Sequence, residues 1–88
     1  MSEIREGATF GEALEHLKAG GRVCREGWNG KGMWLTLIRA GNAMHTSRSG
    51  RFDMQDCIGM KTANNVMQPG WLASQNDMLA SDWVCLPD

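Results

Sequence analysis

Two tryptophans of this 88-residue chain, Trp28 and Trp71, each directly follow a glycine, in segments typical of turns rather than of apolar stripes. An indole in such a segment can offer its face to a planar ligand, and stacking on a nucleobase contributes about 1 to 3 kcal/mol per base in nucleic-acid systems. The alternative is that both rings close the ends of a small core. Trp34 and Trp83 lie inside strand-like runs, which favours packing for these two.

Polar groups suited to a nucleotide-like molecule lie close to both tryptophans in the sequence. Lys31 could approach a pyrophosphate, and Asn29, with the amides of the neighbouring glycines, could bind phosphate oxygens. Gln75, Asn76 or Asp77 could bind ribose hydroxyls or a base edge. Each has an ordinary alternative, because a lysine is usually a solvated surface charge and Asp77 can be occupied in capping its own helical turn. The spacing supports a Trp-rich binding surface.

Catalysis finds less support in the sequence. His16 and His45 are the only histidines, neither has a neighbouring nucleophile, and we expect both to be solvated. The glycines around Trp28 match neither a P-loop nor a dinucleotide fingerprint. Two carboxylate pairs could act as acid and base only with suitable geometry: Asp53 with Asp56, and Asp77 with Asp82. We therefore expect no enzyme and no catalytic residue.

Composition excludes several partners. Nine basic and ten acidic side chains give a formal net charge of -1, so there is no basic excess for binding a DNA or RNA duplex. No apolar stretch approaches the roughly 20 residues of a membrane helix, and residues 1–7 contain no apolar stretch of the length that an export signal needs. Cys24, Cys57 and Cys85 form no C-x-x-C pair, which predicts buried thiols rather than a metal site. We expect a cytoplasmic protein without metal or cofactor.

Local motifs then predict the elements that position these residues. Thr9 and Glu12 form a capping box, so a helix should begin there, with an apolar stripe over residues 10–17 and a stop at the following glycines. Ser74 and Asp77 repeat the pattern, which predicts a short helical turn before the last strand. Short β-type runs occupy residues 22–25, 33–39, 57–62 and 83–86.

These elements indicate an α+β fold in a single domain, residues 1–88, because so short a chain cannot build two cores. Residues 1–8 form an N-terminal segment. Residues 40–56 have no clear period and are expected to form a long loop or an irregular hairpin.

Two blocks of the sequence resemble a known family. The first comprises TFGEAL from Thr9 and EGWNGKGMWL from Glu26, and the second comprises MKTA from Met60, WLASQ from Trp71 and the DMLA and DW motifs that follow. In order and spacing they resemble the second type of Thoeris anti-defence proteins, a family of phages and prophages. The likeness covers the chain from Thr9 to about Val84, apart from the 40–56 loop.

The resemblance implies a sponge: a protein that binds a cyclic ADP-ribose-type signal (glycocyclic ADP-ribose), made by a bacterial TIR-domain enzyme, and holds it without degrading it. It also implies a fold class, an N-terminal amphipathic helix packed on a small antiparallel β-sheet with a short C-terminal helical turn before the last strand, and a homotetramer with pockets between protomers. The family-like segments give these ligand-binding residues: Trp28, Asn29, Lys31, Trp71, Ser74, Gln75 and Asp77. Cyclic dinucleotides as ligands, or a small protein-binding inhibitor module, are the alternatives.

Overall fold

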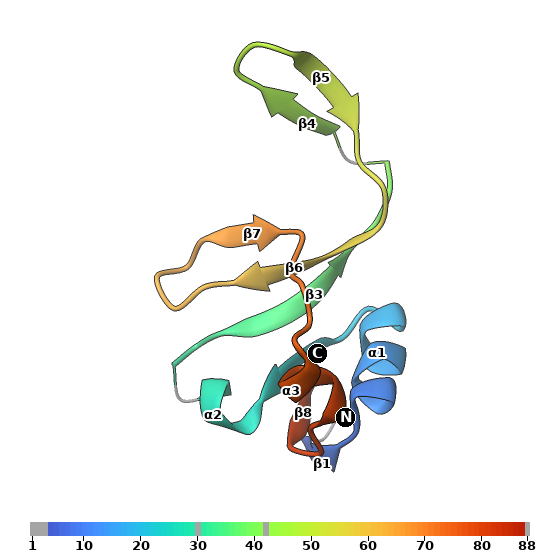
Figure 1. Ribbon diagram of the computed structural model, residues 1–88, viewed down its shortest axis with the longest axis vertical. Coiled ribbons are helices and arrows are strands. Elements are labelled where there is room, and N and C mark those ends of the chain that lie inside the picture. The colour runs from blue at the N-terminus through green and yellow to red at the C-terminus, as the bar shows by residue number, and fades with distance from the viewer. Residues whose placement is uncertain (1–3, 30, 42, 88) are drawn as a thin grey trace.

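The computed structural model describes residues 4–29, 31–41 and 43–87, which contain eight strands and three short helices (Figure 1). The strands are β1 (Arg5–Ala8), β2 (Arg22–Arg25), β3 (Trp34–Ile38), β4 (Ala43–Thr46), β5 (Gly50–Asp53), β6 (Cys57–Lys61), β7 (Met67–Pro69) and β8 (Trp83–Leu86). The helices are α1 (Phe10–Lys18), α2 (Glu26–Asn29) and α3 (Gln75–Leu79).

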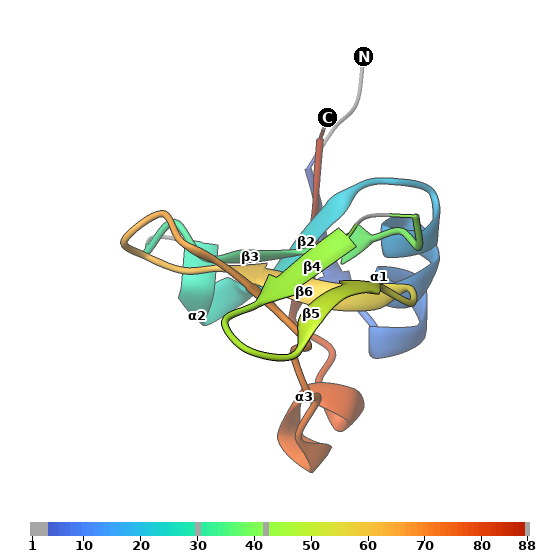
Figure 2. The same cartoon turned by 90° about the horizontal axis from the view of Figure 1, so that it is seen from above.

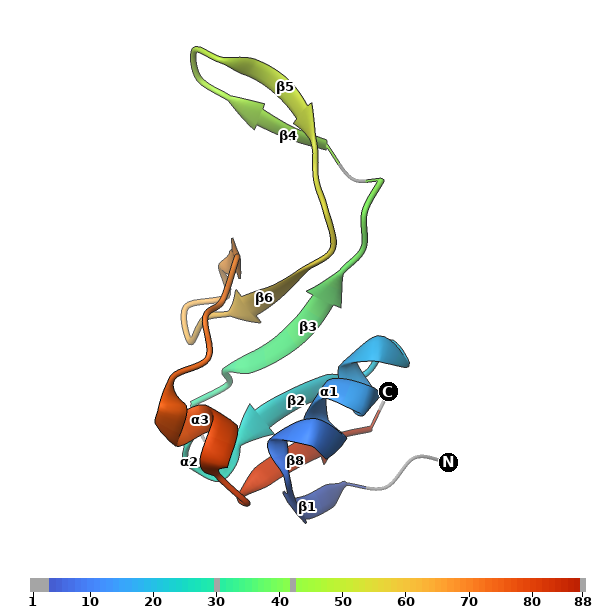
Figure 3. The ribbon, with the colours of Figure 1, turned by 45° about the vertical axis from the view of Figure 1, so that its right-hand side comes forward.

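Six of the strands form one antiparallel sheet in the order β1-β8-β2-β3-β6-β7. The three helices lie over one face of this sheet (Figures 2 and 3). Strands β4 and β5 pair only with each other, as a hairpin that projects from the body (Figure 1). The ladders place Val23, Leu35 and Cys85 on the face that the helices cover, because Val23 pairs with both of the others.

The expected fold class, α+β with an N-terminal helix packed on a small sheet, is wrong. The molecule is mostly antiparallel β-sheet, and its helices are small, with only nine residues in α1. The missed strands, β1 and β7, are short and lie at the two edges of the main sheet. Edge strands of three or four residues show no clear alternation of apolar and polar residues, and β7 even ends in Pro69.

The 40–56 region, expected to be a long loop or an irregular hairpin, contains the β4–β5 hairpin. In the 40–56 region Ala43 pairs with Asp53 and Thr46 with Gly50, in a continuous register. All of β5 is exposed, so no buried face imposed the alternation that would have indicated a strand. In the 1–8 segment, β1 pairs with β8 through an irregular register around Gly7, whose φ is +67°.

Helix α1 confirms the capping-box prediction, since Thr9 and Glu12 cap it reciprocally. Its buried face packs on β2, β3 and β8. His16 is not solvated as expected: it is half-buried, and its Nε2 donates to the carbonyl oxygen of Leu86 (2.9 Å). Gly21 lies against this ring, and any Cβ there would collide with the imidazole. Packing against His16 therefore requires a glycine at position 21, after the end of the helix.

The core centres on Trp83, which is fully buried on β8. Cys24 and Cys85 are buried nearby as free thiols, as expected, whereas Cys57 is only half-buried. Loss of solvation raises the pKa of the Cys24 and Cys85 thiols, so both stay protonated at neutral pH. Within the described part of the chain, no helix has the length and apolar character to cross a membrane.

Candidate functional site

The structure brings together Trp28 and Trp71, which lie 43 positions apart in the sequence. Their ring centroids are 6.2 Å apart, and each ring also packs edge-on against Trp83, at 5.7 and 6.1 Å. Trp28 belongs to α2, and Trp71 follows β7. Both indoles are half-buried, so each has one part fixed in the core and another open to solvent. Packing on Trp83 and access for a ligand are therefore compatible.

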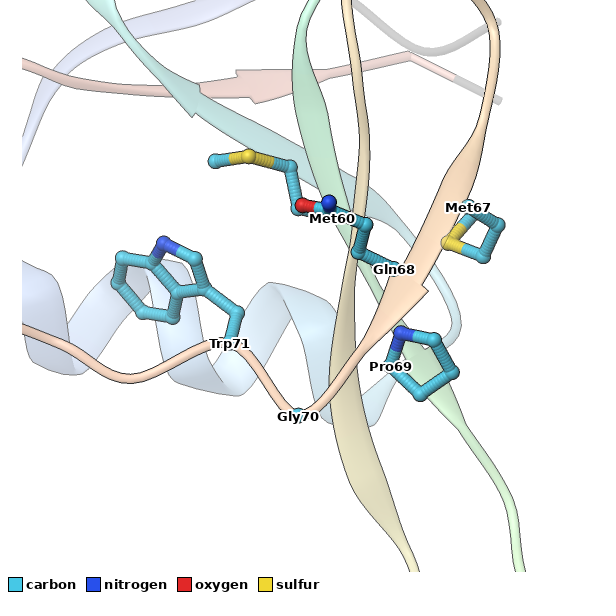
Figure 4. Close-up of a pocket in the computed structure, with 6 residues that line it drawn as sticks. All are labelled: Met60, Met67, Gln68, Pro69, Gly70 and Trp71. Carbon is cyan, nitrogen blue, oxygen red and sulfur yellow. The ribbon is translucent and has the colours of Figure 1, made fainter. Parts of the chain in front are cut away.

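A hollow of about 400 Å³ lies beside Trp71 (Figure 4). Its volume is in the range of about 300 to 1,000 Å³ that is usual for small-molecule sites. The lining residues are Met60, Met67, Gln68, Pro69, Gly70 and Trp71. Of these, only Trp71 was expected from the sequence. The others come from β6, from the unrecognised strand β7 and from Gly70 directly after it. The available signal was the Met67–Pro69 run before Gly70 and Trp71.

Gly70 gives the hollow its shape. Its φ is +87°, a left-handed conformation that strains any residue with a side chain, and it turns the chain from β7 toward Trp71. The amides of Gly70 and Trp71 both donate to the carbonyl oxygen of Ile58, at 2.9 and 2.8 Å. These two hydrogen bonds fix the backbone that carries the indole.

Strand pairing then decides which side chains face Trp71. Met60 on β6 pairs with Gln68 on β7, and both side chains extend toward the Trp71 side of β7 (Figure 4). Met67 and Pro69 extend to the other side of β7, as strand alternation requires. The wall near the indole therefore consists of a thioether and an amide.

Two lysines adjoin at the turn after α2. The backbone amide of Lys31 donates to the carbonyl oxygen of Trp28 (2.9 Å), and its side chain is exposed. Nζ of Lys61 donates to the carbonyl oxygen of Gly32 (2.9 Å), next to Lys31. Lys61 pairs with Met67 of the hollow, so strand alternation places its side chain on the side of the sheet that Met67 faces, opposite to Met60 and Trp71. Sequence reasoning missed Lys61, although it belongs to the family-like MKTA block.

Asn29 is the last residue of α2, but its side chain lies outside the described part of the structure, as does Gly30. Gln75 begins α3 and is exposed. Gln75 is not among the described residues that line the hollow. The predicted contacts of Asn29 and Gln75 with a ligand stay predictions.

Ser74 and Asp77 are already bound to each other. One Asp77 oxygen, Oδ2, accepts from the Ser74 amide and hydroxyl at 3.0 and 2.9 Å, which forms the expected cap of α3. The other, Oδ1, accepts from Nη1 of Arg25 at 2.9 Å. Desolvation acts to raise the pKa of Asp77, but the bonds from Ser74 and Arg25 outweigh it and hold this pKa below its ordinary value. Asp77 therefore stabilises the fold before any ligand is present.

Arg25 also binds Asp82, with Nε to Oδ1 at 2.7 Å, and its guanidinium lies 6.0 Å from the centroid of the Trp83 ring. The hydrogen bond to Asp82 is the main cause that raises the pKa of Arg25. Because Trp83 Nε1 donates to the carbonyl oxygen of Asp77 (2.9 Å), α3 is attached to the core at two points. We call Arg25, Ser74, Asp77 and Asp82 the Arg25 network.

Comparison with known proteins identifies the family of this chain. Residues 8–86 match the Tad2-like family, described as the Thoeris anti-defense 2-like domain. The chain belongs to this family. A relative from Bacillus phage SP01, named "Thoeris anti-defense 2", is 42% identical over 82 residues, which span 85% of this chain and 90% of the relative. The family resemblance noted in the sequence is confirmed.

The Tad2-like match contains the three clustered tryptophans, both adjoining lysines and the whole hollow. It also contains the carboxylate pairs considered for catalysis. Asp77 and Asp82 share Arg25, and Asp56 accepts from the amide of Ala40 (2.6 Å). Among the residues described, no group of three or more His, Cys, Asp or Glu side chains has an arrangement that could hold a metal ion.

Proposed function

We propose that this protein binds and sequesters a cyclic ADP-ribose-type immune signal, of the glycocyclic ADP-ribose kind, without degrading it. The effector protein of Thoeris defence, which this signal activates, then stays inactive. Membership of the Thoeris anti-defense 2-like family supports the coarser part of this proposal, a phage function directed against Thoeris defence. The finer part, sequestration of an intact nucleotide, is argued from the site.

The observation that carries the proposal is the hollow beside Trp71. Lys31, in the turn after α2, and Lys61, which donates to the carbonyl oxygen of Gly32 in that turn, are the candidate cations. A cyclic ADP-ribose combines a flat base with a diphosphate, so it needs an aromatic surface and cations within one site. Trp71 and Trp28 supply the first, and Lys31 and Lys61, with Lys61 paired to Met67 of the hollow, are the candidates for the second. The indoles are held edge-on by Trp83, so stacking on them requires little reordering of side chains.

Binding without degradation is supported by the state of the carboxylates. An acid catalyst needs a carboxyl that is protonated near neutral pH, with a pKa raised toward the working pH. The pKa of Asp77 is instead lowered, and Arg25 binds both Asp77 and Asp82. Asp77 and Asp82 are therefore suited to holding α3 in place through Arg25, and not to transferring protons to a ligand.

The proposal includes assembly into a homo-oligomer, a tetramer by family resemblance, that acts in the cytoplasm where the signal is made. Leu72, shortly before α3, and Leu79, its last residue, are 89% and 83% exposed. Large apolar side chains exposed to this degree indicate a surface for association. We expect light scattering coupled to gel filtration to give a multiple of the 9.7 kDa chain mass, and the double substitution of Leu72 and Leu79 by serine to lower it.

The test is calorimetric titration of the purified protein with glycocyclic ADP-ribose isomers, followed by heating of the complex and mass spectrometry of what is released. We expect binding and recovery of the intact ligand. Release of a cleaved product would indicate an enzyme, and a ligand that stays free would contradict sequestration. The same titration with cyclic dinucleotides tests whether the protein binds this second class of ligand instead. Failure of both classes would favour the protein-binding module, with the exposed leucines as its contact surface.

A further inference from the structure

We propose that Gln68 reads the edge of the ligand's base and selects a ligand whose base carries a 6-amino group, as adenine does. This inference rests on the proposed function and assigns a specificity-determining role within the same hollow. Neither the sequence motifs nor the family match pointed to Gln68.

The lining of the hollow selects an uncharged, flat group. None of the six described lining residues has a charged side chain, and two of them are methionines. Thioethers and an indole favour contact with the face of a ring, whereas a diphosphate would lose its hydration there without gaining a cation. The base therefore fits the hollow, and the phosphates are left to groups outside it, with Lys31 and Lys61 as the candidates.

The available hydrogen-bonding groups single out Gln68. The amides of Gly70 and Trp71 are already occupied by the carbonyl oxygen of Ile58. Among the described side chains that line the hollow, the Gln68 amide is the one that offers both a donor and an acceptor. It lies beside Met60 on the wall that faces Trp71 (Figure 4). A base in contact with the Trp71 ring would present its edge to this amide.

An amide that donates and accepts at once matches adenine, which presents the 6-amino donor next to a ring-nitrogen acceptor. Removing the 6-amino group leaves the Gln68 carbonyl oxygen without its partner while stacking is retained. For one hydrogen bond in a partly exposed site we expect about a 3- to 10-fold loss of affinity.

The experiment uses two probes, glycocyclic ADP-ribose and its counterpart with hydrogen in place of the 6-amino group. Both are titrated into the wild type and three folded variants: Gln68→Met, Gln55→Met and Gln75→Met. Gln55 is an exposed glutamine between β5 and β6 and serves as the matched control. Circular dichroism checks that each variant is folded.

We expect the wild type and Gln55→Met to prefer the 6-amino probe, and Gln68→Met to bind both probes equally. Equal binding by the wild type, a preference that survives in Gln68→Met, or a preference that is lost in Gln75→Met instead would overturn the role of Gln68. Those outcomes leave sequestration intact. If the wild type binds neither probe, the proposed function fails together with this inference.

Discussion

Two regions that share the tryptophan cluster differ in how far their interactions are already satisfied. In the Arg25 network every charged group has a partner in the same chain, and Trp83 beneath it is fully buried. In the hollow beside Trp71, the indole is half-buried and the amide of Gln68 faces a space of about 400 Å³. The first region holds the fold together, and the second has groups left for a ligand.

This difference teaches that residue type and availability are separate questions. Asp77 and Trp71 were both predicted to bind the ligand, and both types suit a nucleotide. Only the neighbours distinguish them, because the Asp77 carboxylate already accepts bonds from Ser74 and Arg25. Substitutions in the two regions should therefore separate stability from binding.

The largest expected effect is on stability, from Trp83→Ala. This ring is fully buried and contacts Phe10, Trp28 and Trp71. Its removal should lower the free energy of unfolding by about 3 to 5 kcal/mol, by lost burial and a cavity. Chemical denaturation monitored by circular dichroism measures it. A loss below about 1 kcal/mol would mean that Trp83 is not the centre of the core.

Next is Arg25→Met, which leaves two partly buried carboxylates without their cation. We expect a loss of about 2 kcal/mol in the free energy of unfolding, from the charged hydrogen bonds that disappear. Ligand affinity of the folded variant should fall less than in a Trp71→Ala variant. Calorimetric titration well below the melting temperature compares them, and a larger affinity loss in Arg25→Met would place the network in the binding site.

Gly70→Ala should weaken ligand binding with a smaller loss of stability than the two substitutions above. With φ at +87° and open space where a Cβ would lie, the strain should cost about 1 kcal/mol. Gly50→Ala on the hairpin is the matched control, with φ at +96° and similar open space. Both variants should lose similar stability in thermal melts, but only Gly70→Ala should bind ligand more weakly. Equal ligand affinity of the Gly70→Ala and Gly50→Ala variants would show that the hollow is not the binding site.

The smallest expected effect is the loss of stability at low pH that comes from Asp77. Because the folded-state pKa of Asp77 is depressed, its contribution to stability is present above the ordinary carboxyl value of 3.8 and is lost as pH falls through the folded value. Wild-type protein should therefore lose more stability on acidification than Asp77→Asn, in which no carboxylate titrates there. Denaturation series at several pH values compare the two slopes. Parallel slopes would show that Asp77 is not held ionised by the network.

Motifs confined to a few neighbouring residues could be predicted from the sequence. Both capping boxes, at Thr9 and Ser74, form as expected, because each needs only residues three positions apart. Strand β7 and the regular register of the β4–β5 hairpin could not be predicted, since exposed short strands carry little periodicity. The sheet was therefore underestimated and the fold class was wrong.

The candidate site was predictable only in part for a similar reason. Trp71 could be singled out from its own neighbourhood, next to glycine. Its partners could not, because Met60 and Gln68 meet through strand register and Lys61 reaches Gly32 across 29 positions. Such contacts depend on long-range pairing, which no local motif encodes.

The most direct test of the central claim is calorimetric titration of glycocyclic ADP-ribose into the wild type, Trp71→Ala and Phe52→Ala. Phe52 is an exposed aromatic residue on the projecting hairpin and controls for the loss of a ring outside the hollow. We predict that Trp71→Ala weakens binding about 5- to 150-fold, the effect of losing one stacking partner, and that Phe52→Ala binds like the wild type. Binding by folded Trp71→Ala as tight as that of the wild type would contradict the account.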